Sequence, residues 1–130
     1  MSVNESQVTP QYFEVRTFWN SYNVQDNVEH NSDWYPCHDS KKFLLLINLA
    51  ACTLAPTDLK IDVEFSDDKV NWFKYQNDPF GWLKYEDTAP PLKECVSGDC
   101  IGLYVRVSIT GAGCSGANYF TITSIKIILK

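Results

Sequence analysis

The chain has 130 residues, 45% of them hydrophobic and 21% charged, and a formal net charge of −5. This composition is typical of one folded domain and excludes an intrinsically disordered chain. The acidic balance argues against nucleic-acid binding, which requires a positive surface for phosphate contacts. The longest mostly apolar run, Phe43–Ala51, is shorter than the roughly 20 residues of a membrane-spanning helix.

Residues 1–11 are predicted to form an N-terminal arm, followed by a single β domain at residues 12–130. The arm is polar and lacks the basic and apolar segments of a signal peptide, so we expect synthesis in the cytoplasm. Tyr12–Trp19 is rich in aromatic and β-branched residues, which predicts the first strand. Neither face of this strand is purely apolar, so we expect it at a sheet edge or at a subunit contact.

Residues 20–40 are mostly polar, with several Asn, Asp and Ser residues and Pro36. These residue types favour turns, so the segment is predicted to be a long loop, with a short strand at Tyr22–Val28 as an option. Loops of this length are often functional. Trp34 and Tyr35 lie within the segment and are expected to cap one end of the fold or to contact a neighbouring molecule.

The middle of the chain carries two different strand patterns. Phe43–Leu49 is apolar on both faces, which predicts a strand that is buried on both sides. Leu59–Ser66 alternates apolar and polar residues, which predicts one buried and one wet face. The predicted wet face carries Lys60, Asp62 and Glu64.

A β-hairpin is predicted around the turn residues Ser66–Lys69, because Ser and Asp side chains bond to nearby backbone groups. Val70–Tyr75 is the expected returning strand. Phe80–Glu86 is the next short strand, and Pro90 and Pro91 end it because proline cannot donate to a β-ladder.

The C-terminal third of the chain predicts two further strands. Ile101–Ile109 alternates cleanly, and its odd-numbered residues, Ile101 and Leu103 among them, are expected to face the core. Tyr119–Leu129, rich in Ile and Thr, is expected to close the fold. The chain is therefore predicted to be all-β: one antiparallel β-sandwich or jelly roll of about seven or eight strands with an N-terminal arm.

The sequence contains little that indicates chemistry. Cys37 and His38 are neighbours, but they lack the paired knuckles of a zinc site, and no nucleophile, phosphate-binding or metalloprotease motif occurs. We therefore predict no catalytic residues, no metal, no cofactor and no enzymatic activity. Cys95 and Cys100 bracket an expected Gly-Asp turn, and their spacing leaves a local disulfide open.

Aromatic residues are concentrated between residues 72 and 85. Exposed rings of this kind stack on sugars or anchor protein contacts, whereas buried rings only fill a core. Trp72 with Trp82, or Trp34 with Tyr35, would be the ring pairs of a glycan-binding groove. Core packing is the simpler interpretation for any single ring.

Val63–Tyr75, with the sequence VEFSDDKVNWFKY, resembles a motif of bacteriophage virion proteins of the β-sandwich type. Related sequences also occur in carbohydrate-binding modules with a β-sandwich fold. Lys69 stands where glycine is frequent in that motif. The segments Leu103–Thr110 and Thr121–Lys130 also look like the last two strands of such phage proteins. The likeness covers about half of the chain and carries no catalytic residues over.

The resemblance implies a non-enzymatic virion component, most specifically a capsid decoration (cement) protein on the capsid surface. Its partners would be the major capsid protein and copies of itself. The expected interface residues are Tyr12, Phe13, Phe18, Trp19, Trp34 and Tyr35. The alternatives are a carbohydrate-binding module that contacts a host-surface glycan through Trp72 and Trp82, and a tail, fibre or adaptor component of a phage particle.

Overall fold

The computed structural model describes residues 14–51, 56, 58–75, 82–84 and 92–130, and the predicted arm at residues 1–11 lies outside these ranges. The strands of the described residues are β1 (Glu14–Val24), β2 (His30–Asn31), β3 (Tyr35–Pro36), β4 (Lys42–Leu49), β5 (Asp58–Ser66), β6 (Trp72–Lys74), β7 (Trp82–Lys84), β8 (Leu92–Asp99), β9 (Tyr104–Ala112) and β10 (Phe120–Leu129).

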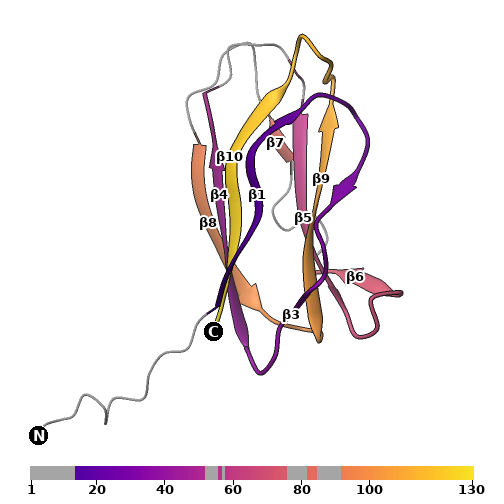
Figure 1. Cartoon of the computed structure of the whole chain (residues 1–130), viewed down its shortest axis with the longest axis vertical. Helices are drawn as coiled ribbons and strands as arrows, with labels where there is room; N and C mark the ends of the chain where they lie inside the picture. Colours follow the sequence, from indigo (N-terminus) through magenta and orange to yellow (C-terminus); the bar gives the residue numbers. More distant parts are fainter. Residues whose placement is uncertain (1–13, 52–55, 57, 76–81, 85–91) are drawn as a thin grey trace, which may run out of the picture.

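The strands form two antiparallel sheets that pack face to face, so the predicted β-sandwich is confirmed (Figure 1). The first sheet has the order β1-β10-β4-β8, and we call it sheet A. The second, sheet B, has the order β2-β9-β5-β6, with β3 also paired to β9 and β7 also paired to β5. The strand segments outnumber the predicted seven or eight because the short strands β2, β3, β6 and β7 share partners along β9 and β5.

The core lies between the two sheets and consists mainly of alternate residues from β4, β5, β9 and β10, with Val24 at the end of β1. On β4, for example, Phe43, Leu45, Ile47 and Leu49 are all buried. Such period-two burial follows from the pleat, which turns successive side chains to opposite faces. The fully buried core also includes Val24, Leu59, Ile61, Val63, Phe65, Val105, Val107, Ile109, Phe120, Ile122, Ile125, Ile127 and Leu129.

Strand β1 is longer than predicted, because it continues through residues that were expected to be loop. Val24 at its end is completely buried, and Tyr22 packs against the core. A register shift between Thr17 and Trp19 marks a bulge at Phe18. The bulge explains why Phe18 and Trp19, which are consecutive, both pack against the core instead of pointing to opposite faces.

Three other sequence predictions are wrong in detail. The segment before Cys100 forms the edge strand β8, where a turn was expected. Strand β9 begins only at Tyr104, so Ile101 and Leu103 precede it and are exposed, not core residues. The outer face of β4 is only partly buried at Leu44 and Leu46, because no third layer covers sheet A in the described structure.

Tyr75 ties the end of the β5–β6 hairpin to the opposite sheet. Its ring packs against Phe43 of sheet A and Phe65 of sheet B, with centroid distances of 5.1 and 6.1 Å. The backbone N–H of Asp99 donates a hydrogen bond of 2.9 Å to the Tyr75 hydroxyl. Gly98 allows this approach, since a Cβ at that position would lie 2.5 Å from the same hydroxyl oxygen.

Candidate functional site

The outer face of β5 is buried from Asp62 to Ser66 and partly buried at Lys60, which contradicts the predicted wet face. Asp62 is 4% exposed and Glu64 is 2% exposed, although both side chains point away from the core. Buried carboxylates are costly unless they are paired with positive groups or hydrogen-bond donors. The sequence pattern gave the correct face for these residues but could not reveal what covers that face.

Glu64 is neutralised by Arg106 from the neighbouring strand β9. The two residues are directly paired across the sheet, and Arg106 Nε donates a hydrogen bond of 2.7 Å to Glu64 Oε1. The Arg106 guanidinium lies over two indole rings, 4.3 Å from the centroid of Trp34 and 4.8 Å from that of Trp72. These cation–π contacts and the carboxylate together fix the guanidinium in place.

Asp62 is surrounded by two lysines. Its Oδ2 atom lies 3.4 Å from Lys74 Nζ and 3.7 Å from Lys60 Nζ. Its buried Oδ1 atom has no hydrogen-bond partner among the described residues. Because Asp62 and Glu64 both have positive neighbours, this face of sheet B is a packed ionic layer, not an open acidic cleft.

The hairpin turn beyond β5 is held by its own side chains. Ser66 Oγ accepts a hydrogen bond of 2.8 Å from the Lys69 backbone N–H. Asp68 Oδ1 accepts hydrogen bonds of 2.8 Å from the backbone N–H groups of Val70 and of Asn71. These bonds lower the pKa of Asp68 to about 2. The turn is therefore held in its conformation by bonds within the hairpin, before any partner binds.

The hairpin also contacts the segment that leads into β9. Asp67 Oδ1 accepts a hydrogen bond of 3.2 Å from the Leu103 backbone N–H, and Lys69 Nζ lies 4.6 Å from the centroid of the Tyr104 ring. Lys69 has a φ of 65°, the left-handed conformation that glycine adopts easily. Lys69 therefore keeps the backbone conformation that glycine would adopt at this position of the motif.

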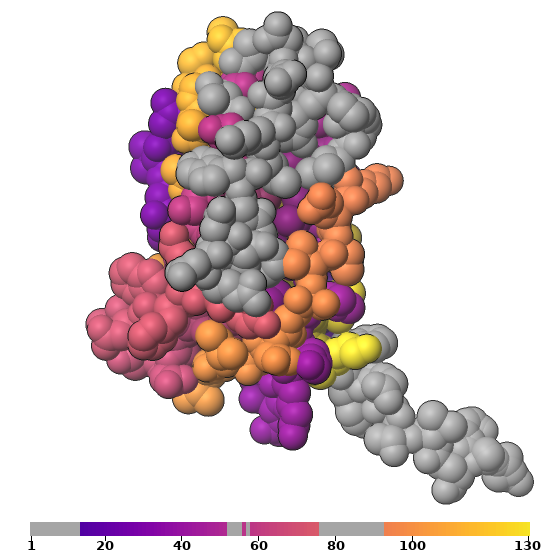
Figure 2. Space-filling model, turned by 180° about the vertical axis from the view of Figure 1, so that it is seen from behind, coloured from indigo at the N-terminus to yellow at the C-terminus, as the bar shows by residue number. Residues whose placement is uncertain are grey.

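The tip of this hairpin exposes large apolar side chains. Phe73 is 67% exposed and Trp72 is 50% exposed, and Val70 is exposed beside them. The hairpin stands out from the body of the molecule in both views (Figures 1 and 2). Val70, Asn71, Trp72 and Phe73 together line an open stretch of surface at this tip. We call Val70, Trp72 and Phe73 the hairpin patch, and Asp67 belongs to the turn of the same hairpin.

The structure separates the two members of one predicted ring pair. Trp34 stacks on Arg106 on the outer face of sheet B, whereas the Tyr35 hydroxyl donates a hydrogen bond of 2.9 Å to Glu14 of sheet A. This bond and burial raise the pKa of Tyr35. Trp34 and Tyr35 therefore do not line a common groove. The rings that do share a neighbour are Trp34 and Trp72, which both contact the Arg106 guanidinium.

The remaining predicted residues are placed as follows. Phe18 and Trp19 pack edge to face, with centroids 6.5 Å apart, and both contact the core. Trp82 is paired in register with Lys60 of β5, and its side chain lies outside the described structure. Tyr12 and Phe13 also lie outside the described residues.

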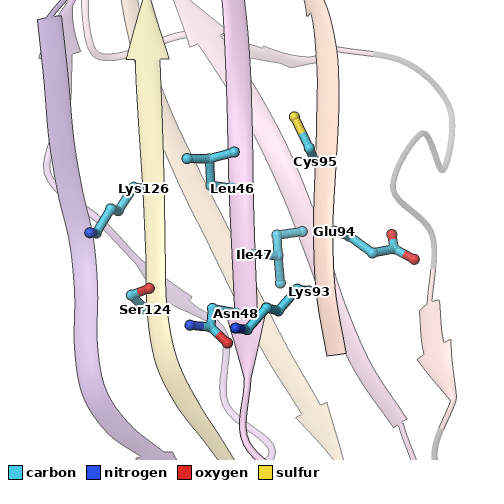
Figure 3. Close-up of a pocket in the computed structure, with 8 residues that line it drawn as sticks. All are labelled: Leu46, Ile47, Asn48, Lys93, Glu94, Cys95, Ser124 and Lys126. Carbon is cyan, nitrogen blue, oxygen red and sulfur yellow. The ribbon is translucent and has the colours of Figure 1, made fainter. Parts of the chain in front are cut away.

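The outer face of sheet A carries a hollow of about 360 Å³. It is lined by Leu46, Ile47, Asn48, Lys93, Glu94, Cys95, Ser124 and Lys126, and we call it the sheet hollow. These residues come from the neighbouring strands β10, β4 and β8 (Figure 3). In the same view the Glu94 carboxylate points away from the other lining side chains.

The cysteines are not arranged as the spacing suggested. Cys95 lies on the extended strand β8, and five residues of strand span roughly 16 Å, which is too far from Cys100 for a disulfide. Cys100 instead shares a hydrogen bond with the thiol of buried Cys37. This bond and burial raise the pKa of Cys37, and the same bond lowers the pKa of Cys100.

The part of the chain that the structure describes contains no group of three or more His, Cys, Asp or Glu residues that could hold a metal ion. His30 is engaged with Asp26 at 2.8 Å, and His38 lies 3.7 Å from Glu14. None of the described segments forms a helix of the length and hydropathy that a bilayer crossing needs.

Sequence reasoning identified Trp72 and Trp34 but missed Arg106, the residue that joins them. The signal was present, since Glu64 and Arg106 lie on the polar faces of two clean alternating segments. Only the strand register, however, places them opposite each other. Comparisons with known proteins add no identity: neither the scan against protein-family models nor the search of curated proteins gives a match to this chain.

Proposed function

We propose that the protein is a non-enzymatic structural component that acts by docking, most specifically a capsid decoration protein of a bacteriophage particle. The observation that carries the proposal is the hairpin patch. The segment that resembles phage virion proteins, Val63–Tyr75, is the same segment that forms the preorganised hairpin with exposed Trp72 and Phe73.

The physical support comes from what a docking site needs. Binding energy at protein interfaces is concentrated in a few large side chains, with Trp prominent among them. A surface that is rigid before binding also loses less conformational entropy on association. The side-chain bonds of Ser66 and Asp68 give the hairpin this rigidity, and Tyr75 anchors it to both sheets.

The charged residues on the outer face of sheet B bind one another within the protein. Glu64 is bonded to Arg106, and Asp62 lies near two lysines. A general acid or base must instead be within reach of a substrate. These contacts favour a supporting layer beneath the Trp72 ring over a catalytic centre.

Co-sedimentation with purified capsids of the parent phage tests the proposal. The wild-type protein should pellet with capsids, and Phe73→Ser should lower the bound fraction at least tenfold, because it removes an exposed apolar contact. Val28→Ser is a matched control, since Val28 is 61% exposed but lies outside the hairpin. Wild-type protein that stays in the supernatant would exclude the decoration function.

Glycan binding is the second candidate, and one observation favours it. Trp72 is half exposed while Arg106 lies over its ring, so the indole is held as a platform on which a sugar could stack. On this alternative, Trp72→Ala abolishes binding on a glycan array and Phe73→Ser does not. An array without any hit would remove the candidate.

A further inference from the structure

The sheet hollow lies on an apolar face that no part of the described structure covers. Leu44 and Leu46 of β4 and Ile128 of β10 are partly buried on this face, and Val15 of β1 is exposed on it. A strand with apolar residues on both faces is typical of a sheet that is covered on both sides. The sequence of β4 therefore fits a sheet whose outer face meets a partner.

The two surfaces differ in charge. Lys93 and Lys126 line the sheet hollow, and Glu94, its only acidic lining residue among those described, points away from them (Figure 3). The hairpin turn carries the carboxylates of Asp67 and Asp68 and one lysine, Lys69, whose ammonium lies over the Tyr104 ring. The sheet hollow is therefore basic, whereas the hairpin turn has a net negative charge, and opposite charges favour contact between the two surfaces.

The two surfaces also differ in shape. The hairpin patch projects from sheet B, whereas the sheet hollow is a depression on the outer face of sheet A. One molecule cannot bring its own hairpin to that face, because β6 belongs to the opposite layer. The complementary surface has to come from another molecule.

We propose that the hairpin patch of one copy docks into the sheet hollow of a second copy of this chain. Phe73 and Val70 would cover Leu46 and Leu44, while Asp67 approaches the rim that carries the lysines. This assignment rests on the proposed function, in which the hairpin is a protein-docking element, and it names the partner of that element. Because the two patches differ, the contact is head to tail and builds a ring or a filament.

Symmetric pairings are less favourable on the same grounds. Two hollows facing each other would bring the lysines at 93 and 126 against their own copies. Two hairpins facing each other would bring together two turns that each have a net negative charge, from Asp67 and Asp68 against Lys69. Like charges across an interface disfavour the pairing, so the mixed contact is the one that the charges select.

Sedimentation velocity of the full chain, at concentrations from about 10 μM to 1 mM, which brackets weak association, tests the proposal. Wild-type protein should show a mass that rises with concentration. Phe73→Ser removes the hairpin side of the contact and Lys126→Glu reverses charge at the hollow, so each variant alone should remain monomeric. Far-ultraviolet circular dichroism checks that both variants are folded.

An equimolar mixture of the two variants gives the deciding result. Phe73→Ser keeps an intact hollow and Lys126→Glu keeps an intact hairpin, so the mixture should form a heterodimer and nothing larger. Leu46→Ser replaces Lys126→Glu if the charge reversal unfolds the protein. A monomeric wild type, a variant that associates like the wild type, or a mixture that stays monomeric would each overturn the proposal.

The outcome is separable from that of the capsid experiment. If the wild type is monomeric in solution but Phe73→Ser still abolishes capsid binding, the hairpin binds the capsid and the self-docking proposal is wrong. If the mixture forms the heterodimer while the wild-type protein does not bind capsids, the self-docking proposal is supported and the decoration function is wrong.

Discussion

Arg106 and Glu64 form an ion pair that is almost removed from water, with side-chain exposures of 12% and 3%. Such pairs add little net stability over apolar side chains of the same size, but removing one partner leaves a buried charge without compensation. The arrangement therefore specifies where the Trp34 and Trp72 rings sit more than it stabilises the fold.

Arg106→Leu should accordingly lower the free energy of unfolding by about 3–5 kcal/mol, as measured by urea denaturation. The double variant Glu64→Leu/Arg106→Leu should lose less than Arg106→Leu alone, because no uncompensated carboxylate remains. A double variant that is less stable than the single one would show that the pair itself contributes the stability.

The Cys37 and Cys100 thiols are in contact, and the pKa of Cys100 is lowered by the hydrogen bond from Cys37. Treatment with glutathione disulfide should therefore link these two residues: the Cys100 thiolate forms a mixed disulfide and Cys37 then displaces glutathione. Two protein thiols are oxidised while one glutathione disulfide becomes two glutathione molecules, and the protein loses about 2 Da.

Peptide mapping of the oxidised protein identifies the bond. Cys95→Ser should oxidise as the wild type does, because Cys95 lies on the outer, exposed side of β8. A peptide that links Cys95 to Cys100 would contradict the observed strand and support the turn that the sequence suggested.

The hairpin of β5 and β6 is the element that combines a rigid turn with an exposed apolar tip. Lys69 holds a left-handed backbone conformation, which costs a residue with a Cβ about 1 kcal/mol or more. Lys69→Gly should therefore be more stable than Lys69→Ala by about 1 kcal/mol, since both lose the contact with Tyr104. Thermal unfolding of the two variants measures the difference, and equal stability would contradict the turn geometry.

Acid should weaken the same hairpin through Asp68. The pKa of this group is lowered in the folded state from 3.8 to about 2. A lowered pKa in the folded state gives stability that is present above pH 4 and is lost as the pH falls towards 2. The free energy of unfolding should fall over this window less steeply in Asp68→Asn than in the wild type. Identical pH dependence would show that the turn bonds do not hold.

At the scale of the whole molecule, alternation in the sequence was sufficient to predict the sandwich and most of its long strands. The burial of Ile61 and Val107, for example, can be predicted from the period-two alternation alone. The alternation could not predict which residues cover the outer faces of the two sheets. The burial of Glu64 depends on Arg106, 42 positions later in the chain, and the incomplete burial of Leu44 depends on the absence of a third layer in the described structure.

The same limit explains the errors at strand ends. Ile101 and Leu103 fit the alternation of β9, yet the Asp67–Leu103 hydrogen bond joins this segment to the hairpin turn before the strand begins. The bulge at Phe18 likewise shifts the alternation within β1, where neither face of the predicted strand is purely apolar. The local sequence pattern predicts which side chains share a face of a strand. The pairing of distant strands determines where each strand begins and which residues cover its outer face.

Hydroxyl-radical footprinting of the protein bound to capsids tests the central claim, docking through the hairpin patch, most directly. Oxidation of Trp72 and Phe73 should fall at least severalfold on binding, while Val28, which is exposed elsewhere, should react as in the free protein. Protein that pellets with capsids while Trp72 and Phe73 remain as reactive as before would contradict the account.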